Sequence, residues 1–349
     1  MNWLINPVSK KLSTLELLKS VLPASDQLVA SSFTFYPAIL EIVPEFYQTE
    51  KHYETLPDGS KSSAYGLSTQ DIERAIAKHG IDVIYPVPSH RPQQLIWWRK
   101  FAIDHPEIHL PLSSLETLEI CADKKRSYDF LSRNGFPVAP YALADANDFG
   151  TLEEILGPAP WFAKERCGGG SVNTRWVHNI GELRALPQGM ILQQKLSGNE
   201  YTLNCYVDRS GKCRAVVPHQ RWETIDGEVS YGITVKNPVL MQIGARLAEA
   251  LPLAYGPLNF QVFHDPSKGP ISEQTISFTD LNPRIGGGYP LCHAAGGEFL
   301  RYLGLEAHGE PLPASAGTWE EGVIIDRRDG NLKIVRKGFA EAAKSHAIQ

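Results

Sequence analysis

The stretch Phe-Thr-Asp-Leu-Asn-Pro-Arg-Ile-Gly-Gly-Gly, residues 278–288, decides the fold of this chain. It begins apolar, places Asp280, Asn282 and Arg284 at alternate positions, and continues into three glycines. Alternate side chains of a strand lie on one face, so the pattern predicts a carboxylate, an amide and a guanidinium side by side. Such a set suits a magnesium ion that carries phosphate oxygens. Taken alone, the pattern equally fits a strand end with a solvent-facing ion pair.

Composition narrows the class of protein. A length of 349 residues favours two or three subdomains. The net charge of -5 argues against a nucleic-acid partner. No apolar run is long enough to span a membrane and the N-terminus does not resemble a signal peptide, so we expect a cytoplasmic protein with no membrane partner. The five cysteines show no CxxC spacing, which indicates reduced structural thiols rather than a zinc or redox site.

Residues 1–112 are predicted to form a small α/β domain. A strand-helix-strand pattern over residues 3–31 is typical of a parallel sheet. Ser68 and Gly80 have the chemistry of a helix N-cap and a helix stop. The apolar run at 81–87 that follows is typical of a strand buried on both faces.

Two loops of this domain bear on ligand binding. The first strand is not followed by a glycine-rich phosphate turn, which argues against a dinucleotide site. Residues 47–65 are polar and we expect a surface loop. His90 and Arg91 follow the strongest strand, where open α/β sheets place ligands, so they either contact substrate or belong to an ordinary loop.

Two segments in the middle of the chain have residues suited to binding phosphate. Asp123 is a plausible N-cap that puts Lys124 in the first turn of a helix, where the dipole disfavours cations unless an anion is near; the alternative is a solvated basic patch. A second strand-like run ends in Lys164 and leads to a loop whose backbone N–H groups could wrap a phosphate and close as a lid. That loop contains Gly168, Gly169, Gly170 and Ser171.

The next strands complete a pocket. Residues 190–193 form an apolar strand that leads into a polar linker, whose backbone groups could pair with the edge of a flat base. Glu200 at its end could accept from ribose hydroxyls or be simply solvated. In the strand at 256–263, Asn259 and Gln261 share a face, and this strand pairs naturally with the one that carries Asp280.

In this order, the motifs resemble those of ATP-grasp enzymes, and most closely the ATP-grasp unit of the carbamoyl phosphate synthetase large subunit. The resemblance covers about residues 113–335. It implies an α/β fold in which a Rossmann-like pre-ATP-grasp domain, residues 1–112, precedes a two-subdomain α+β ATP-grasp fold. Residues 113–190 would be the small lid subdomain with its linker helix, and residues 191–349 the C-terminal subdomain.

The resemblance also implies the cofactors, ATP and two Mg²⁺ ions, with Mn²⁺ as an alternative metal. Lys124 and Lys164 would hold the phosphates, with Lys164 also catalytic, and the glycine loop would cover them. The adenine pocket would be lined by Gln193, Lys195 and Leu196, and Glu200 would bind the ribose.

The resemblance also implies which residues bind the metal ions and which residue contacts the transferred phosphate. Gln261, Asp280 and Asn282 would hold the metal ions, and Arg284 would steady the γ-phosphate or an acyl phosphate. Two positions depart from the usual pattern, since Asp280 stands where most members have glutamate and Gln193 where many do. Arg221 is a further candidate from the residues themselves, because it lies in a segment between two hairpins that could face the substrate.

The chemistry that follows is ATP-dependent ligation of a small-molecule carboxylate to an amine, through an acyl phosphate, with ADP and phosphate released. The alternative enzymatic activity is a carbamoyl-phosphate-type reaction that phosphorylates bicarbonate. A nucleotide-binding protein without turnover is the alternative from another class. A homodimer is expected only because it is the commonest closed assembly.

Overall fold

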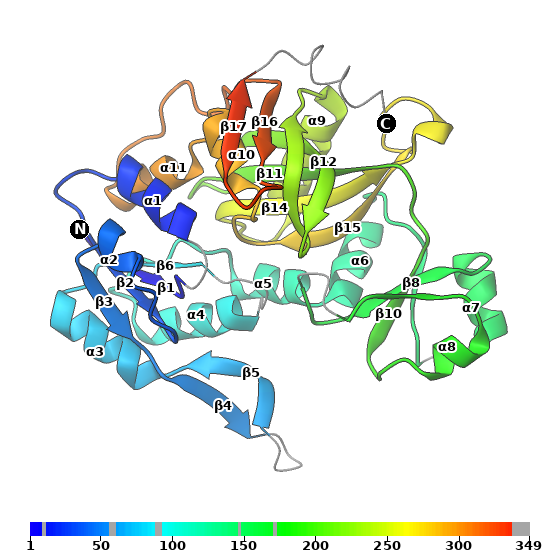
Figure 1. The fold of residues 1–349 in the computed structure, drawn as a ribbon, viewed down its shortest axis with the longest axis horizontal. Helices are drawn as coiled ribbons and strands as arrows, with labels where there is room; N and C mark the ends of the chain where they lie inside the picture. Colours follow the sequence, from blue (N-terminus) through cyan, green and yellow to red (C-terminus); the bar gives the residue numbers. More distant parts are fainter. Residues whose placement is uncertain (9–11, 56–60, 88–92, 146–147, 170–172, 337–349) are drawn as a thin grey trace.

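The computed structural model describes residues 1–8, 12–55, 61–87, 93–145, 148–169 and 173–336. The described residues form two four-stranded sheets, one seven-stranded sheet and one two-stranded hairpin. Figure 1 shows the large sheet above, with the N-terminal sheet and the second small sheet below it on opposite sides. No helix in these ranges is both long and apolar enough to cross a bilayer.

The first sheet is parallel, as predicted, with the strand order β3-β2-β1-β6. Its strands are β1 (Asn2–Asn6), β2 (Gln27–Ser32), β3 (Glu45–Gln48) and β6 (Val83–Pro86). The helices of this region are α1 (Leu12–Val21), α2 (Ile39–Ile42), α3 (Thr69–His79) and α4 (Gln93–Asp104). The predicted signals around α3 are confirmed, since the Ser68 hydroxyl accepts from the backbone N–H of Asp71 and Gly80 ends the helix at a φ of 57°.

The expectation of a loop at residues 47–65 is wrong. The segment contains β4 (Lys51–Thr55) and part of β5 (Lys61–Leu67), which pair antiparallel as a hairpin that extends away from the first sheet (Figure 1). The signal was present in the sequence, because an Asp-Gly dipeptide between two β-forming runs is typical of a tight hairpin turn. That dipeptide, Asp58-Gly59, lies outside the described residues.

The second sheet is a small antiparallel one, in the order β7-β10-β8-β9, and we call it the lid sheet. It comprises β7 (Tyr141–Leu143), β8 (Trp161–Glu165), β9 (Arg175–Val177) and β10 (Met190–Gln194), with helices α7 (Phe149–Leu156) and α8 (Ile180–Arg184) beside it. Because β10 pairs with both β7 and β8, a domain boundary after residue 190 would cut through this strand. We therefore place the proposed boundary in the linker at 195–198.

The seven-stranded sheet is antiparallel throughout, in the order β15-β14-β11-β12-β13-β16-β17. Its strands are β11 (Asn199–Val207), β12 (Cys213–Ile225), β13 (Glu228–Thr234), β14 (Gly256–His264), β15 (Ile276–Asn282), β16 (Val323–Asp326) and β17 (Lys333–Arg336). The remaining helices are α5 (Leu115–Ala122), α6 (Lys124–Arg133), α9 (Pro238–Ala250), the 3-10 turn η1 (Pro266–Lys268), α10 (Tyr289–Ala294) and α11 (Phe299–Ala307).

The register of this sheet brings polar residues of four strands into one row. Gln261 of β14 lies opposite Asp280 of β15, which confirms the predicted pairing of these strands. Continuing across the sheet, Thr202 of β11 lies opposite Gln261, and His219 of β12 lies opposite Thr202. Residues directly opposite each other in an antiparallel sheet share a face. The row therefore faces one side of the sheet as a continuous polar wall.

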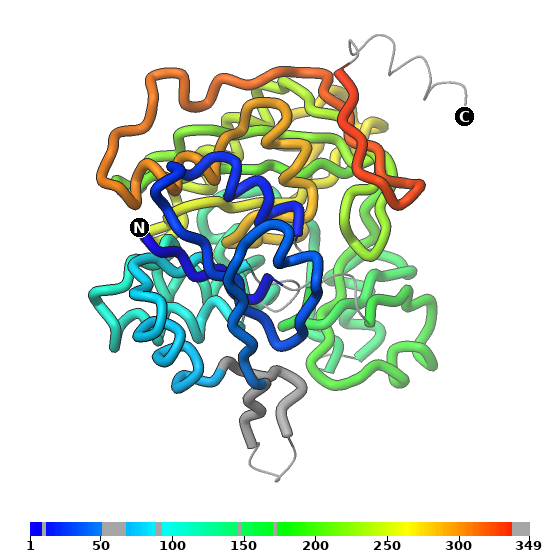
Figure 2. The backbone as a smooth tube through the Cα atoms, turned by 60° about the vertical axis from the view of Figure 1, so that its left-hand side comes forward, coloured from blue at the N-terminus to red at the C-terminus, as the bar shows by residue number. Residues whose placement is uncertain are grey.

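The N-terminal sheet and the C-terminal third of the chain share a hydrophobic core. Trp3 and Leu18 belong to the same buried cluster as Tyr289, Phe299 and Tyr302. Helix α1 packs against α11, and Figures 1 and 2 show the N-terminal segment beside the C-terminal helices. The N-terminal region is therefore packed into the rest of the molecule rather than attached through a linker.

Candidate active site

A cavity of about 400 Å³ lies where the lid sheet meets the polar face of the large sheet. The lid sheet contributes Lys164 and Gln193, and the large sheet contributes Asp280 and Asn282. The loop that follows β15, residues 284–288, forms one end of the cavity. Most of the residues predicted from the sequence therefore line a single cavity.

Helix α6 carries Lys124 to the cavity from its first turn. Asp123 caps the helix by accepting from the backbone N–H groups of Lys125 and Arg126. The same carboxylate pairs with Arg166 at 2.7 Å, which joins the helix to the end of β8. Lys124 Nζ donates to the Gly168 carbonyl at 2.6 Å and lies 3.5 Å from Asp280 Oδ1. The cap thus fixes the position of a cation that would otherwise be unfavourable at a helix N-terminus.

Lys164 reaches the same place from β8. Its side chain is buried, with 6% of the residue surface exposed, and Nζ donates to the Thr279 carbonyl at 3.2 Å. Nζ also lies 5.3 Å from the centre of the Tyr128 ring. Burial lowers the pKa of Lys164 to about 8, although the nearby Asp280 carboxylate opposes this change. Lys164 is therefore a poorly solvated cation that gains from a bound anion.

Asp280 is the carboxylate between these lysines. Burial alone would raise the pKa of Asp280, but Lys124 and Lys164 outweigh this effect and the net pKa lies below its usual value. Asp280 is consequently ionised at neutral pH and can serve as a ligand for a hard cation.

Two of the predicted metal ligands, Gln261 and Asp280, belong to the polar wall, and Asn282 lies two residues beyond Asp280 on the same face of β15. Asn282 donates through Nδ2 to Asn259 Oδ1 at 3.4 Å, which leaves its own Oδ1 for a ligand. Within the described ranges, no three His, Cys, Asp or Glu residues gather as a metal cluster, because these three side chains offer one carboxylate and two amides. Mg²⁺ is commonly held by one or two carboxylates together with substrate phosphates. Gln261, Asp280 and Asn282 therefore fit an ion that arrives with a nucleotide.

The end of the cavity that the lid sheet forms has an unpaired donor. Gln193 is 2% exposed, and in the part of the chain that the structure covers its Nε2 has no hydrogen-bond partner. Its Oε1 lies 3.5 Å from the Tyr128 hydroxyl, which donates to the Thr279 carbonyl at 2.8 Å. A buried donor without a partner costs about 1–3 kcal/mol, so an acceptor nitrogen of a bound base would compensate for it. This end therefore fits an adenine ring.

Of the two predicted adenine residues in the linker after Gln193, only one lines the cavity. Leu196 lines the cavity. Lys195 is exposed, is not part of the cavity lining, and has its Nζ 5.8 Å from the centre of the Trp176 ring. Only its backbone is thus left for the role at the adenine.

Glu200 and Arg221 lie on the cavity wall and bind each other. Arg221 forms a salt bridge to Glu200 and donates to the Gly227 carbonyl at 2.7 Å. Burial raises the pKa of Glu200, and Arg221 offsets this only in part. The roles of Glu200 at the ribose and Arg221 at the substrate stay predictions, and the pair has to be considered as a unit.

Other predicted residues are only partly covered. Gly168 and Gly169 line the cavity. Gly170 and Ser171 lie outside the described residues, and so do His90 and Arg91.

The structure adds residues that the sequence did not single out. Phe162 and Trp176 bring aromatic surface to the cavity from the lid sheet, with ring centres 5.1 Å apart. Thr202, His219 and Glu228 add polar groups from the large sheet. Strand alternation in the sequence would have identified Thr202 and His219. Thr202 lies two residues after Glu200, and His219 lies two residues before Arg221.

Residues 121–288 match the family of ATP-grasp domains. The chain carries an ATP-grasp domain. The match begins at the end of α5 and ends with the glycine loop. It therefore contains Lys124, Lys164, Gln193 and the polar wall. It confirms the resemblance to ATP-grasp enzymes that was inferred from the motifs, and the use of ATP and Mg²⁺ is typical of this family. Comparison with curated proteins finds no match.

Solved structures with ATP-grasp domains share the fold over almost the whole chain. Biotin carboxylase from Campylobacter jejuni, in a complex described as β,γ-ATP, aligns with a TM-score of 0.71 at 17% identity, covering 93% of this chain and 75% of that one. The biotin carboxylase domain dimer of the Hydrogenobacter thermophilus 2-oxoglutarate carboxylase, with MgADP, ADP and bicarbonate, gives 0.68 at 17% identity over 93% and 74%. L-amino acid ligase from Bacillus licheniformis gives 0.63 at 16% identity over 93% and 78%. These likenesses confirm the predicted fold class.

Proposed function

We propose that the protein is an ATP-dependent ligase that activates a carboxylate as an acyl phosphate and joins it to an amine. The observation that carries this proposal is the convergence of Lys124 and Lys164, from two different elements, on Asp280 in one cavity. Two lysines around one carboxylate leave an excess of positive charge that suits a triphosphate.

The proposed residue roles imply one orientation of the nucleotide in the cavity. The base would lie at Gln193 and the lid-sheet aromatics, and the phosphates would lie under Gly168 and Gly169 between the two lysines. Gln261, Asp280 and Asn282 would hold Mg²⁺, which neutralises charge on the phosphate oxygens when it is bound.

The protein's part in the reaction is positioning and electrostatics. A carboxylate oxygen attacks the γ-phosphorus, the bond from that phosphorus to the β–γ bridging oxygen breaks, and ADP leaves. Lys124, Lys164 and Arg284 hold the transferred group and keep its charge compensated. The amine then attacks the acyl carbon, loses a proton, and displaces inorganic phosphate to leave an amide.

Bicarbonate is the second candidate for the acid. The resemblance to carbamoyl phosphate synthetase favours it, and one structure with the same fold is described as holding bicarbonate. ATP turnover that depends on bicarbonate, with no other carboxylate added, would distinguish this reaction from ligation of an organic acid.

The direct test is a panel of carboxylates and amines incubated with the protein, ATP and Mg²⁺. We expect ADP release that requires one acid and one amine, with a product whose mass equals their sum less one water. Tight nucleotide binding with no ADP release across the panel and with bicarbonate would contradict the proposal and would favour a nucleotide-binding protein without turnover.

Two further expectations concern the setting of the enzyme. We infer a homodimer by analogy with the H. thermophilus domain, which is described as a dimer, and light scattering at micromolar concentration tests it. A cytoplasmic location stays a prediction, which fractionation of the source cells would check.

A further inference from the structure

The glycine loop after Arg284 crosses the polar face of the large sheet in close contact. A Cβ at Gly286 would lie 3.2 Å from Asn259 Nδ2 on β14. A Cβ at Gly287 would overlap the Glu228 carboxylate on β13, and one at Gly288 would lie 2.9 Å from Nε2 of His219 on β12. The loop therefore lies against His219 and Glu228, which line the same cavity as Arg284. If the nucleotide lies between the two lysines, this part of the cavity is left for the acid.

The proton of His219 is on Nε2. Asn204 donates through Nδ2 to the Val217 carbonyl at 3.0 Å, and because a carbonyl can only accept, this contact identifies the amide nitrogen. The same Nδ2 lies 3.0 Å from Nδ1 of His219. Nδ1 must therefore accept, which leaves the ring proton on Nε2.

This Nε2–H is buried and unpaired. His219 is 1% exposed, and Nε2 has no hydrogen-bond partner among the residues that the structure describes. Burial, with Arg221 and Arg327 nearby, lowers the pKa of His219 to about 3, so the ring is neutral at physiological pH. The fold thus holds a neutral donor at the cavity wall without giving it an acceptor.

The charges around this donor favour an anion. Arg327 lies 3.5 Å from Glu228 and also donates to the Gly287 carbonyl at 3.2 Å. Arg284 lines the same end of the cavity and is also influenced by the charge of Glu228. Arg221 and Arg327 are the guanidinium groups that act on the His219 ring, and each has a carboxylate partner, Glu200 and Glu228. With Arg284, three guanidinium groups and two carboxylates lie at or beside this part of the cavity, which leaves net positive charge.

We propose that His219 is a catalytic residue that donates a hydrogen bond from Nε2 to an oxygen of the carboxylate substrate, and that Asn204 is the positioning residue that keeps the proton there. The inference rests on the proposed function, since it assigns the acid to the end of the cavity at Gly288. Arg284 would compensate the negative charge of that acid, and the hydrogen bond from His219 would orient it.

A neutral donor suits an oxygen whose charge changes during the reaction. The carboxylate oxygen is anionic at first, becomes the carbonyl oxygen of the acyl phosphate, and becomes an oxyanion when the amine attacks. Nε2–H can donate at each stage without giving up its proton. It is strongest when negative charge develops, which is the condition for accelerating the reaction.

The first test needs no turnover. We would record ¹⁵N spectra of the histidine-labelled protein with Mg²⁺ and a non-hydrolysable ATP analogue, and assign His219 by comparison with His219→Gln. We expect a protonated Nε2 and an unprotonated Nδ1, and a downfield shift of the Nε2 signal on titration with acetate. Asn204→Asp should move the proton to Nδ1. A wild-type ring protonated on Nδ1, or an Nε2 signal unchanged at saturating acetate, would overturn the proposal.

The second test uses the acid that gives the highest ADP release. The Gln amide can place a donor close to the position of Nε2, whereas Leu cannot. We expect His219→Leu to lower kcat/KM for the acid by about 10- to 100-fold with an unchanged KM for ATP, and His219→Gln to recover most of it. Equal losses in both variants would count against His219. If the wild type releases no ADP with any acid, the proposed ligation fails, while the acetate titration still decides the role of His219.

Discussion

At the scale of single residues, the site depends on cations that the fold holds at a cost. Lys164 is buried beside Lys124, and Asp280 is the carboxylate that compensates both. A buried cation is stabilised poorly by the protein alone and strongly by a bound polyanion. The buried position of Lys164 is therefore explained by phosphate binding rather than by a contribution to the stability of the fold.

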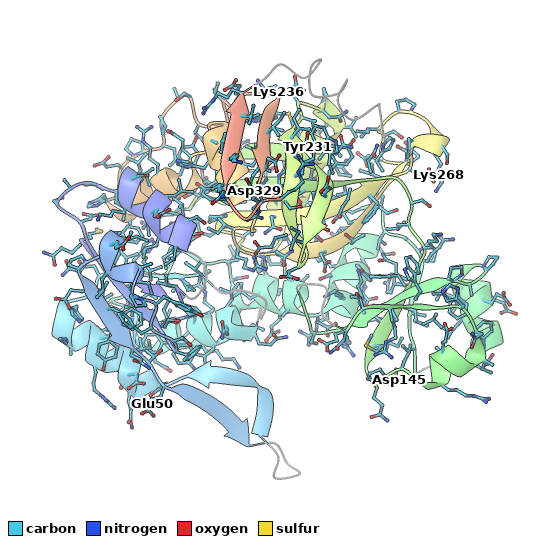
Figure 3. All side chains as sticks on the ribbon, viewed as in Figure 1. Glu50, Asp145, Tyr231, Lys236, Lys268 and Asp329 are labelled. Carbon is cyan, nitrogen blue, oxygen red and sulfur yellow. The ribbon has the colours of Figure 1, made fainter. Side chains whose placement is uncertain are left out.

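Replacing Lys164 with methionine tests this directly. Methionine fills a similar volume without charge, so we expect the melting temperature to stay the same or rise, while ADP release falls by about 100-fold or more. Lys268→Met is the matched control, because Lys268 lies on η1 (Figure 3) and is not among the residues that line the cavity. A Lys164→Met protein that turns over ATP normally would remove Lys164 from the site.

The lowered pKa of Lys164 predicts a pH dependence of nucleotide binding. Below pH 8 the lysine is protonated in the free protein, and above pH 8 it becomes neutral, whereas bound phosphates keep it charged. Affinity for the Mg²⁺ complex of a non-hydrolysable ATP analogue should therefore fall by up to about tenfold between pH 7 and pH 9. Calorimetric titration measures this. Lys164→Arg, which stays charged over the whole range, should bind with nearly constant affinity.

At the scale of elements, local signals predicted most of the helices and strands. The caps at Ser68 and Asp123 are formed as expected, because capping depends only on neighbouring residues. The pairing of the Gln261 and Asp280 strands was also predictable from their shared chemistry.

What the sequence did not predict depends on contacts between distant segments. The placement of β10 in the lid sheet is set by partners on β7 and β8, far away in the chain. Glu228 is recognised as part of the site through the glycine loop, which returns across β13 and lies against its carboxylate. No local pattern records such a return, so Glu228 could be found only in the folded chain.

The glycine loop itself gives a prediction at this scale. A Cβ at Gly287 would displace the Glu228 side chain, which is flexible, so Gly287→Ala should lower the melting temperature little. It should nevertheless reduce acid-dependent ADP release, because it shifts the carboxylate that balances Arg327. Kinetics of Gly287→Ala in wild-type and Glu228→Ala backgrounds would check this. If Gly287→Ala costs as much without the Glu228 carboxylate as with it, the steric explanation is wrong.

At the scale of the whole molecule, the cavity lies between the lid sheet and the large sheet, and side chains near the site link the two sheets. Lys164 of the lid sheet donates to the Thr279 carbonyl of the large sheet, and Lys124 donates to Gly168. A nucleotide with its metal would bind both sheets at once and should stabilise their relative arrangement.

We therefore expect a thermal shift that depends on both ligands. A non-hydrolysable ATP analogue with Mg²⁺, at about 100 times its Kd, adds roughly 2.7 kcal/mol to the free energy of unfolding, which raises the melting temperature by a few degrees. Removing Mg²⁺ with a chelator should reverse most of the shift in the wild type. Asp280→Asn should respond to the nucleotide but show little further effect of Mg²⁺, and a full Mg²⁺ effect in that variant would rule out Asp280 as the metal ligand.

The core shared by Trp3, Leu18 and Phe299 has a consequence for synthesis on the ribosome. The first sheet is complete when residue 86 has been translated, yet the helices that cover part of it come some 200 residues later. At about 5–20 residues per second, its apolar surface waits roughly 10 to 40 s for its partners. During that interval we expect this apolar surface to stay exposed on the nascent chain, until the last third of the polypeptide emerges and covers it.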